Sequence, residues 1–227
     1  AITRAQQIFV PTQTVANTVE QYYQRSSAKI LVTKEGIAEE LLNKAQTMNT
    51  TTRESGCILY VGSLYPHKNI GVVLKALQEL PKYRLEIIGS RNVFQDSVRA
   101  QVTELGLEKQ VTFLGKVSDT TLAQHYAAAE LVIQPSFSEG FGLTGLEALA
   151  FSTPVVAADT PIFHEVYQTA AEYFDPHSVK DCIRAILTAT QEQTWQRLSK
   201  QAATVTRQYN WDVLVQKTFA AYTRQLE

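Results

Sequence analysis

Short apolar runs alternate with longer stretches of helical period along most of this chain, which predicts a parallel sheet with crossover helices. The apolar runs are CILYVG (57–62), RLEIIG (84–89), VTFLG (111–115), LVIQP (131–135), PVVAA (154–158) and a weaker EYF (172–174). The helical stretches are NIGVVLKALQEL (69–80), FQDSVRAQVTELGL (94–107), TTLAQHYAAAE (120–130) and LTGLEALA (143–150). Strands that are apolar on both faces carry helices on both, so the fold class is α/β with a doubly wound, Rossmann-like parallel sheet. Ligands of such sheets bind at the carboxyl ends of the strands.

The two ends of the chain do not follow this repeat. Residues 7–23 predict a strand, a threonine cap and a helix, and residues 29–37 predict another strand and a turn. Residues 43–56 (NKAQTMNTTTRESG) are interpreted as a polar linker and a domain boundary. Residues 193–209 and 211–227 predict two helices, the second capped by Asn210.

Composition and charge exclude several classes of protein. With 44% hydrophobic and 19% charged residues, the 227-residue chain can bury a good core. A formal net charge of −1 and the lack of a basic run make nucleic acid an unfavourable partner. The longest apolar runs fall far short of the roughly 20 residues that a transmembrane helix needs. Cys57 and Cys182 stand apart without metal-ligand spacing, and we interpret both as reduced core thiols.

Two acids, Glu139 and Glu147, bracket three glycines in PSFSEGFGLTGLEALA (135–150). A helix that begins near Gly142 or Leu143 places Glu147 at the border between the core and the strand-end cleft, while Glu139 lies in the preceding loop. Gly140 and Gly142 let a ligand approach the backbone, and free N–H groups at the helix start can bind an anion. From spacing alone, the pattern is explained equally well by a ligand-binding pair of acids and by two ordinary acids, with Glu139 a solvated loop residue and Glu147 a boundary residue.

The loop YVGSLYPHKN (60–69) leads from a predicted strand through a glycine turn to a helix with Asn69 as its predicted cap. It belongs to the same edge of the sheet. Lys68 at the mouth of this helix suits a diphosphate, although a surface lysine is the commoner outcome of such a pattern. His67 alone is more often structural or exposed than catalytic.

Together these residues resemble the nucleotide-sugar half of retaining glycosyltransferases of the GT-B fold, specifically those of family 4. That family carries a Glu-x7-Glu motif in the form P-S-x-x-E-G-F-G-L-x-x-x-E-A, and residues 135–148 match it at every named position. The resemblance extends through 111–136, 153–166 and 172–176, and so covers nearly all of residues 57–190. It divides the chain into the tail of an acceptor domain with the interdomain segment (1–45), a donor-binding domain (46–209) and a C-terminal crossover helix (210–227).

The resemblance implies a role for each matching residue. Lys68 contacts the donor diphosphate, Glu147 holds the ribose hydroxyls and Glu139 contacts the donor sugar; Lys68 and Glu139 are the implied catalytic pair. The implied donor-binding residues are Gly62, Ser63, His67, Lys68, Gly115, Lys116, Val117, Glu139, Gly140, Phe141, Gly142, Leu143, Thr144 and Glu147. Many members of the family carry an arginine where this chain has Ser63. Either another residue compensates, with His67 and Arg91 as the candidates, or stabilisation of the leaving group is weaker.

The implied function is the transfer of a hexose, mannose-like or glucose-like, from a nucleoside diphosphate sugar to an acceptor hydroxyl with retention of configuration. No cofactor and no metal are expected. The acceptor, a glycan or a lipid-linked sugar, would bind an N-terminal domain that precedes Ala1, so we expect this chain alone to bind nucleotide without transferring sugar. The expected location is the cytoplasm, and peripheral association of the full-length protein with a membrane is left open. The alternatives are another GT-B sugar-phosphate enzyme and a non-catalytic nucleotide-binding module; a nicotinamide-binding Rossmann module is disfavoured because no strand precedes G-x-G-x-x-G.

Overall fold

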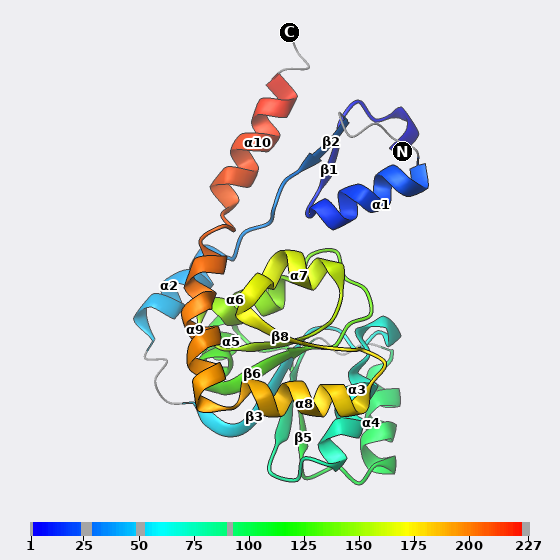
Figure 1. The fold of residues 1–227 in the computed structure, drawn as a ribbon, viewed down its shortest axis with the longest axis vertical. Helices are drawn as coiled ribbons and strands as arrows, with labels where there is room; N and C mark the ends of the chain where they lie inside the picture. Colours follow the sequence, from blue (N-terminus) through cyan, green and yellow to red (C-terminus); the bar gives the residue numbers. More distant parts are fainter. Residues whose placement is uncertain (1, 24–28, 49–52, 90–92, 224–227) are drawn as a thin grey trace.

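A six-stranded parallel sheet forms the centre of the protein, in the strand order β5-β4-β3-β6-β7-β8 (Figure 1). The computed structural model used here describes residues 2–23, 29–48, 53–89 and 93–223. The strands are β3 (Glu54–Val61), β4 (Arg84–Ile88), β5 (Val111–Gly115), β6 (Ala129–Gln134), β7 (Val155–Ala158) and β8 (Ala171–Phe174). The predicted fold class and all six predicted strands are therefore confirmed.

The strand order reverses between β3 and β6. The chain runs outward from β3 through β4 to β5, returns to the centre at β6, and continues outward on the other side through β7 to β8. At such a reversal the connections leave the two central strands in opposite directions, which opens a crevice at their carboxyl ends. The loops that follow Val61 and Gln134 border this crevice.

Helices cover both faces of the sheet. On one face α3, α4 and α8 pack together, and on the other α2, α5 and α6 do so, with α9 bridging α6 and α8. The helices of this lobe are α2 (Glu39–Thr47), α3 (Ile70–Gln78), α4 (Gln95–Glu104), α5 (Asp119–Ala128), α6 (Leu143–Ala150), α7 (Pro161–Tyr167), α8 (Val179–Ala189) and α9 (Glu192–Thr206), with short 3-10 turns η3 (Pro66–Lys68) and η4 (Gln168–Ala170). The four predicted crossover helices are confirmed. Helices α7 and α8 were not predicted, although Thr160 and Ser178 cap them.

The prediction of a polar linker over residues 43–56 is wrong at both ends. Helix α2 continues to Thr47 and β3 begins at Glu54, while residues 49–52 lie outside the described part of the chain. Helix α2 forms because Leu41 is buried in the core, as is Ile37 just before the helix, and Leu42 packs against them. Where one folding unit ends and the next begins stays a prediction.

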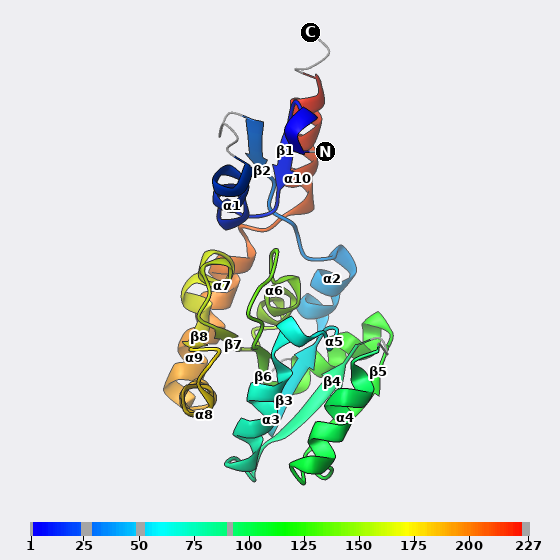
Figure 2. The ribbon, with the colours of Figure 1, turned by 90° about the vertical axis from the view of Figure 1, so that its right-hand side faces the viewer.

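A smaller lobe contains the first and the last described elements of the chain (Figure 2). Its parallel pair is β1 (Ile8–Val10) with β2 (Ile30–Val32), and its helices are η1 (Ile2–Arg4), α1 (Gln13–Tyr23) and α10 (Trp211–Thr223). The predicted caps are present, since Thr12 Oγ1 accepts from Val15 N at 3.1 Å and Asn210 Oδ1 accepts from Asp212 N at 2.7 Å. None of the described helices is both long and apolar enough to cross a membrane.

Glu165 of α7 joins the two lobes. Its carboxylate accepts hydrogen bonds from Gln13 N at 2.6 Å and from Thr14 N at 2.8 Å, with the Thr14 hydroxyl as a third donor at 2.8 Å. The two N–H groups belong to the first turn of α1 and have no partner within the helix, and a negative charge is favourable at this end of a helix. The acid therefore caps a helix of the small lobe from the large one.

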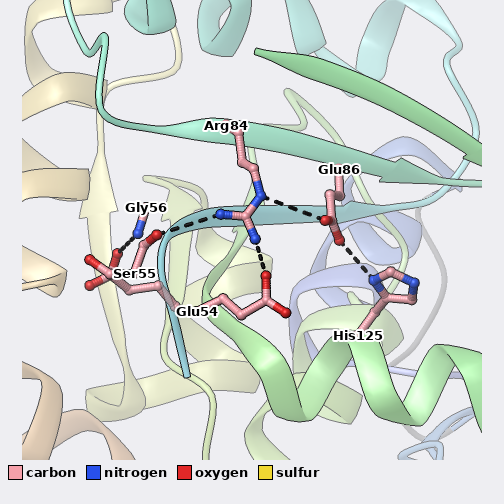
Figure 3. Close-up of polar contacts among 7 residues, drawn as sticks. Glu54, Ser55, Gly56, Arg84, Glu86 and His125 are labelled. Atoms are coloured by element: carbon pink, nitrogen blue, oxygen red, sulfur yellow. Dashed lines mark hydrogen bonds and ion pairs between the residues drawn. The ribbon is translucent and has the colours of Figure 1, made fainter. Parts of the chain in front are cut away.

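A group of charged side chains lies at the opposite, amino-terminal edge of the sheet (Figure 3). Arg84 pairs with Glu54 and lies 3.8 Å from Glu86, whose other oxygen lies 2.7 Å from His125 Nδ1. Cys57 lies beside this group, but burial, with a smaller contribution from Glu86, raises the pKa of its thiol to about 12. A thiol of that pKa remains protonated and is not a nucleophile. Cys57 and Cys182 are both free and buried, as predicted.

The register of β3 against β6 shifts between Glu54 and Ile58, and Gly56 lies inside this irregularity. Gly56 has φ +78°, and a Cβ atom there would lie 2.4 Å from Lys82 O. Its N–H donates to the buried carboxylate of Glu130 at 2.5 Å. A residue with a side chain can therefore neither adopt this backbone easily nor fit the space.

We expect Gly56→Ala to lower the free energy of unfolding by more than about 2 kcal/mol, since it adds a clash with a backbone oxygen to the strain of a positive φ. Gly106→Ala is the matched control: Gly106 has φ +68° with no atom within 4 Å of an added Cβ. It should cost about 1 kcal/mol, the conformational strain alone. Urea unfolding of both variants measures the difference, and equal losses would mean that the clash with Lys82 is relieved by a backbone shift.

Candidate functional site

A cavity of about 320 Å³ opens at the reversal of strand order, where β3 and β6 end. It is bounded by the end of β3, the loop after β6 and the first turn of α6, and also by two residues from the beginning of the chain. The lining residues are Pro11, Glu35, Tyr60, Val61, Gly62, Lys68, Gln134, Glu139, Gly140, Phe141, Gly142, Leu143 and Thr144. The edge of the sheet predicted to carry the site is thus hollowed.

Lys68 and Glu139 both line this cavity and form an ion pair in its wall. Lys68 lies in the loop after β3 and Glu139 in the loop after β6, and Lys68 Nζ lies 2.5 Å from Glu139 Oε1. The same carboxylate oxygen accepts from Ser136 Oγ at 2.8 Å. Both charged side chains are less than one fifth exposed. Residues 71 positions apart are therefore joined by a shielded ion pair, and the interpretation of Glu139 as a solvated loop acid is wrong.

Asn69 fixes the two loops relative to each other. Its side-chain amide donates to Pro135 O at 3.1 Å and to Pro176 O at 2.9 Å, so it ties the loops after β3, β6 and β8 together. Asn69 stands at the N-cap position of α3, as predicted, but it has φ 54° and its side chain makes no cap hydrogen bond. Asparagine tolerates this left-handed backbone better than most residues. Asn69 therefore determines where its neighbour Lys68 is held.

The first turn of α6 is shaped by glycines packed against Tyr167. Gly142 has φ +99°, and a Cβ atom there would lie 2.5 Å from the Tyr167 hydroxyl; at Gly145 the distance would be 2.4 Å. The Tyr167 hydroxyl donates to Gly142 O at 2.6 Å. Burial raises the pKa of Tyr167 far above its usual value, so this hydroxyl remains a donor. The helix begins at Leu143, as predicted, because Gly142 adopts the left-handed backbone that admits the turn.

Glu147 is buried rather than at a solvated boundary. Its side chain points from α6 toward α5, where Tyr126 Oη donates to Glu147 Oε2 at 2.8 Å. Burial raises the pKa of Glu147, the bond from Tyr126 partly opposes the shift, and the charge of Asp119 adds to it. The alternative of an ordinary solvated acid is therefore wrong. Glu147 does not line the cavity itself but lies four residues beyond Leu143, which does.

The remaining predicted site residues are not among those that line the main cavity. His67 is exposed, with its ring stacked on Tyr65 at 6.0 Å, and Ser63 uses its carbonyl to accept from Tyr60 Oη at 2.5 Å. Gly115 lines a narrow slot together with Gly62, beside the main cavity. Lys116 is exposed and Val117 half-buried just after β5. Arg91, the other candidate to compensate for the missing arginine, lies outside the described residues.

Several residues of the site were missed by sequence reasoning. Gln134 Nε2 donates to the Thr144 hydroxyl at 2.9 Å and so holds a side chain of the predicted site. Tyr126 and Tyr167 are aromatic residues of helical segments, where nothing in their spacing distinguishes a hydrogen-bonding tyrosine from a core residue. Glu35 lies in the segment between β2 and α2, far from the motifs in sequence, and only the tertiary fold brings it to the cavity wall.

Comparison with known proteins gives a consistent result. The sequence model of the family described as Glycosyl transferases group 1 matches residues 44–207. The chain is 33% identical over 187 residues to an O-antigen chain mannosyltransferase of Salmonella typhimurium, covering 82% of this chain and 51% of the relative. It is 28% identical over 240 residues to D-inositol 3-phosphate glycosyltransferase of Mycobacterium leprae, covering 99% of this chain and 56% of the relative. The chain spans about half the length of these curated relatives.

Solved structures share the fold. Sucrose-phosphate synthase of Thermosynechococcus elongatus superposes with a TM-score of 0.84 at 21% identity, covering 99% of this chain and 59% of that one. The Anabaena protein HepE, solved in complex with UDP and glucose, gives 0.81 at 22% identity, covering 96% and 63%. At these identities the likeness establishes the fold, which is that of GT-B glycosyltransferases.

Because its pKa is raised, Glu147 should make stability depend on pH. Below its unfolded pKa of about 4.5 the carboxyl is neutral in both states; as the pH rises above that value the stability falls, and the loss is complete once the pH exceeds the higher folded pKa. Glu147→Gln keeps the acceptor for Tyr126 without a charge. We therefore expect the variant to be the more stable protein near pH 8, with the difference in Tm shrinking toward about pH 4.

Thermal unfolding across this pH range tests the expectation, with Glu108→Gln as the control because Glu108 is exposed. The control should follow the wild type at every pH. A Glu147→Gln variant that is less stable than the wild type near pH 8 would contradict the assignment of an unfavourable buried charge.

Proposed function

This chain belongs to the glycosyl transferases of group 1, and we propose that it is the donor-binding part of a retaining, family 4 hexosyltransferase. The donor would be a nucleoside diphosphate sugar, and the hexose, mannose-like or glucose-like, would pass to an acceptor hydroxyl. The relatives named above include a mannosyltransferase and an inositol phosphate glycosyltransferase, and both activities fit this proposal. The observation that carries it is the Lys68–Glu139 pair at the reversal of strand order.

Lys68 would bind the diphosphate. Among the described residues that line the cavity it is the one cation, and it lies beside the glycine turn that opens α6. The first N–H groups of a helix and an ammonium group together favour a negatively charged ligand. In the free protein Lys68 is neutralised by Glu139, so a diphosphate would replace a carboxylate as its partner.

The two acids would then have different tasks. Released from Lys68, Glu139 can accept hydrogen bonds from the hydroxyl groups of the hexose, since a carboxylate has acceptor sites and no donor. Glu147, one turn after Leu143 at the start of α6, would hold the ribose hydroxyls. The base would lie toward Gly115, Lys116 and Val117. Tyr126 would keep Glu147 oriented through the bond at 2.8 Å.

In the proposed reaction, the bond between the anomeric carbon and the β-phosphate oxygen breaks. The acceptor oxygen bonds to the same face of that carbon, and the proton of its hydroxyl passes to the departing phosphate oxygen. Lys68 and the α6 N–H groups would stabilise the charge that develops on the diphosphate. Neither Glu139 nor Glu147 is a nucleophile in this scheme, and no bound metal is required.

The proposal extends to the rest of the enzyme. An acceptor glycan or lipid-linked sugar would bind a further domain, and the chain alone would bind donor without transferring sugar because the two domains must close over both substrates. The same proposal includes a role in polysaccharide synthesis and a cytoplasmic location. The alternative location is the surface of a membrane, with the full-length protein bound there peripherally.

We expect Lys68→Ala to lower the affinity for UDP or GDP roughly 10- to 100-fold, because a charge-assisted hydrogen bond is worth about 1.5–3 kcal/mol. Affinity for the unphosphorylated nucleoside should stay unchanged. Glu139→Gln, which replaces the carboxylate proposed to bind the sugar, should leave diphosphate affinity within about threefold (about 0.7 kcal/mol) while it abolishes most of the gain from an attached sugar.

Isothermal titration of the wild type and both variants measures these affinities. A screen of UDP, GDP, ADP and dTDP with their sugar forms first identifies the nucleotide. Equal losses of nucleoside and diphosphate binding in Lys68→Ala would show that Lys68 maintains the fold of the loop rather than contacting phosphate.

A further inference from the structure

The segment that connects the small lobe to the sheet holds Glu35 in a fixed position. Two residues before it, Thr33 is buried and its N–H donates to Val10 O at 2.8 Å. One residue after it, Gly36 is so close to α10 that a Cβ atom would lie 2.6 Å from Trp211 N. Ile37 then enters the core with 2% exposure. The backbone on both sides of Glu35 is therefore immobilised by packing.

The side chain of Glu35 has no such attachment. It lines the same cavity as Lys68 and Glu139, and within the described ranges no hydrogen bond or ion pair engages its carboxylate. The neighbouring Lys34 is directed elsewhere, with its Nζ 5.1 Å from the centre of the Tyr209 ring. A half-buried carboxylate on a rigid backbone is thus presented to the cavity without a protein partner.

The charges of the cavity restrict what Glu35 can bind. Its described lining contains one cation, Lys68, and two carboxylates, Glu35 and Glu139. A diphosphate beside Glu35 would meet a second negative charge, which is unfavourable in a partly shielded site. Neutral hydroxyl groups are suitable, because each can donate to a carboxylate oxygen.

We propose that Glu35 binds hydroxyl groups of a sugar and is a specificity-determining residue, acting from the connecting segment on the cavity that Glu139 also lines. The inference rests on the proposed function, since it requires a sugar in this cavity. The hexose of the donor and a sugar of the acceptor present the same chemistry to Glu35. Because Glu35 makes no hydrogen bond or ion pair with another residue in the described part of the chain, its replacement should leave the fold intact.

The test uses the wild-type chain, Glu35→Gln, and Glu40→Gln as a matched control, since Glu40 is an exposed acid of α2 in the same part of the chain. Titration with UDP, UDP-glucose, GDP and GDP-mannose gives, for each protein, the ratio of sugar-nucleotide to diphosphate affinity. We expect Glu35→Gln to lower this ratio roughly 5- to 20-fold, since glutamine keeps one acceptor oxygen but loses the charge. Diphosphate affinity should stay the same or rise slightly, and Glu40→Gln should resemble the wild type.

A second arm titrates free glucose and mannose into each protein saturated with diphosphate. If Glu35→Gln loses affinity only for these free sugars, the inference holds and the ligand of Glu35 is an acceptor sugar. If it loses affinity for the sugar nucleotide, the inference holds and the ligand is the donor sugar. Unchanged sugar affinities in both arms, with diphosphate binding intact, overturn the role of Glu35 and leave the proposed function standing. A wild-type chain that binds no diphosphate overturns both.

Discussion

The ion pair between Lys68 and Glu139 is the interaction on which the site depends. It joins the loops after the two central strands at the point where the strand order reverses, so it exists only if the sheet has this topology. Asn69 fixes the loop of Lys68, and Ser136 holds the carboxylate of Glu139. A shielded pair of this kind gives a protein little net stability by itself, yet it keeps a cation poised beside a cavity for an anionic ligand.

Several features around the pair oppose stability. Asn69 has a left-handed backbone, which strains a residue that has a side chain, and Glu147 is a buried acid whose pKa is raised by that burial. Each costs free energy that an ordinary residue would not, and such departures from local rules concentrate at functional sites. At the opposite edge of the sheet, by comparison, Arg84 pairs with Glu54 and lies 3.8 Å from Glu86 (Figure 3).

The sequence was sufficient to predict the sheet, because each strand is a short apolar run and each crossover helix has its own period. It also located both acids and Lys68 at one edge, since residues that follow parallel strands share that edge. It could not predict that Glu147 is buried or that Lys68 pairs with Glu139, because both depend on side-chain packing between segments distant in sequence. Helix α2 was missed because polar residues surround its Leu41 and Leu42. The role of Asn69 was missed because a helix cap and a bridge between loops use the same residue type.

The central claim is that a nucleoside diphosphate binds beside the Lys68–Glu139 pair at the reversal of strand order. Hydrogen exchange of the backbone amides, measured with and without saturating UDP or GDP, tests it most directly because it locates the ligand without a substitution. The account predicts slower exchange for residues 62–68 and 140–145 and no change for residues 84–86 at the opposite edge of the sheet. Binding that leaves residues 62–68 and 140–145 unprotected and slows exchange elsewhere would contradict it.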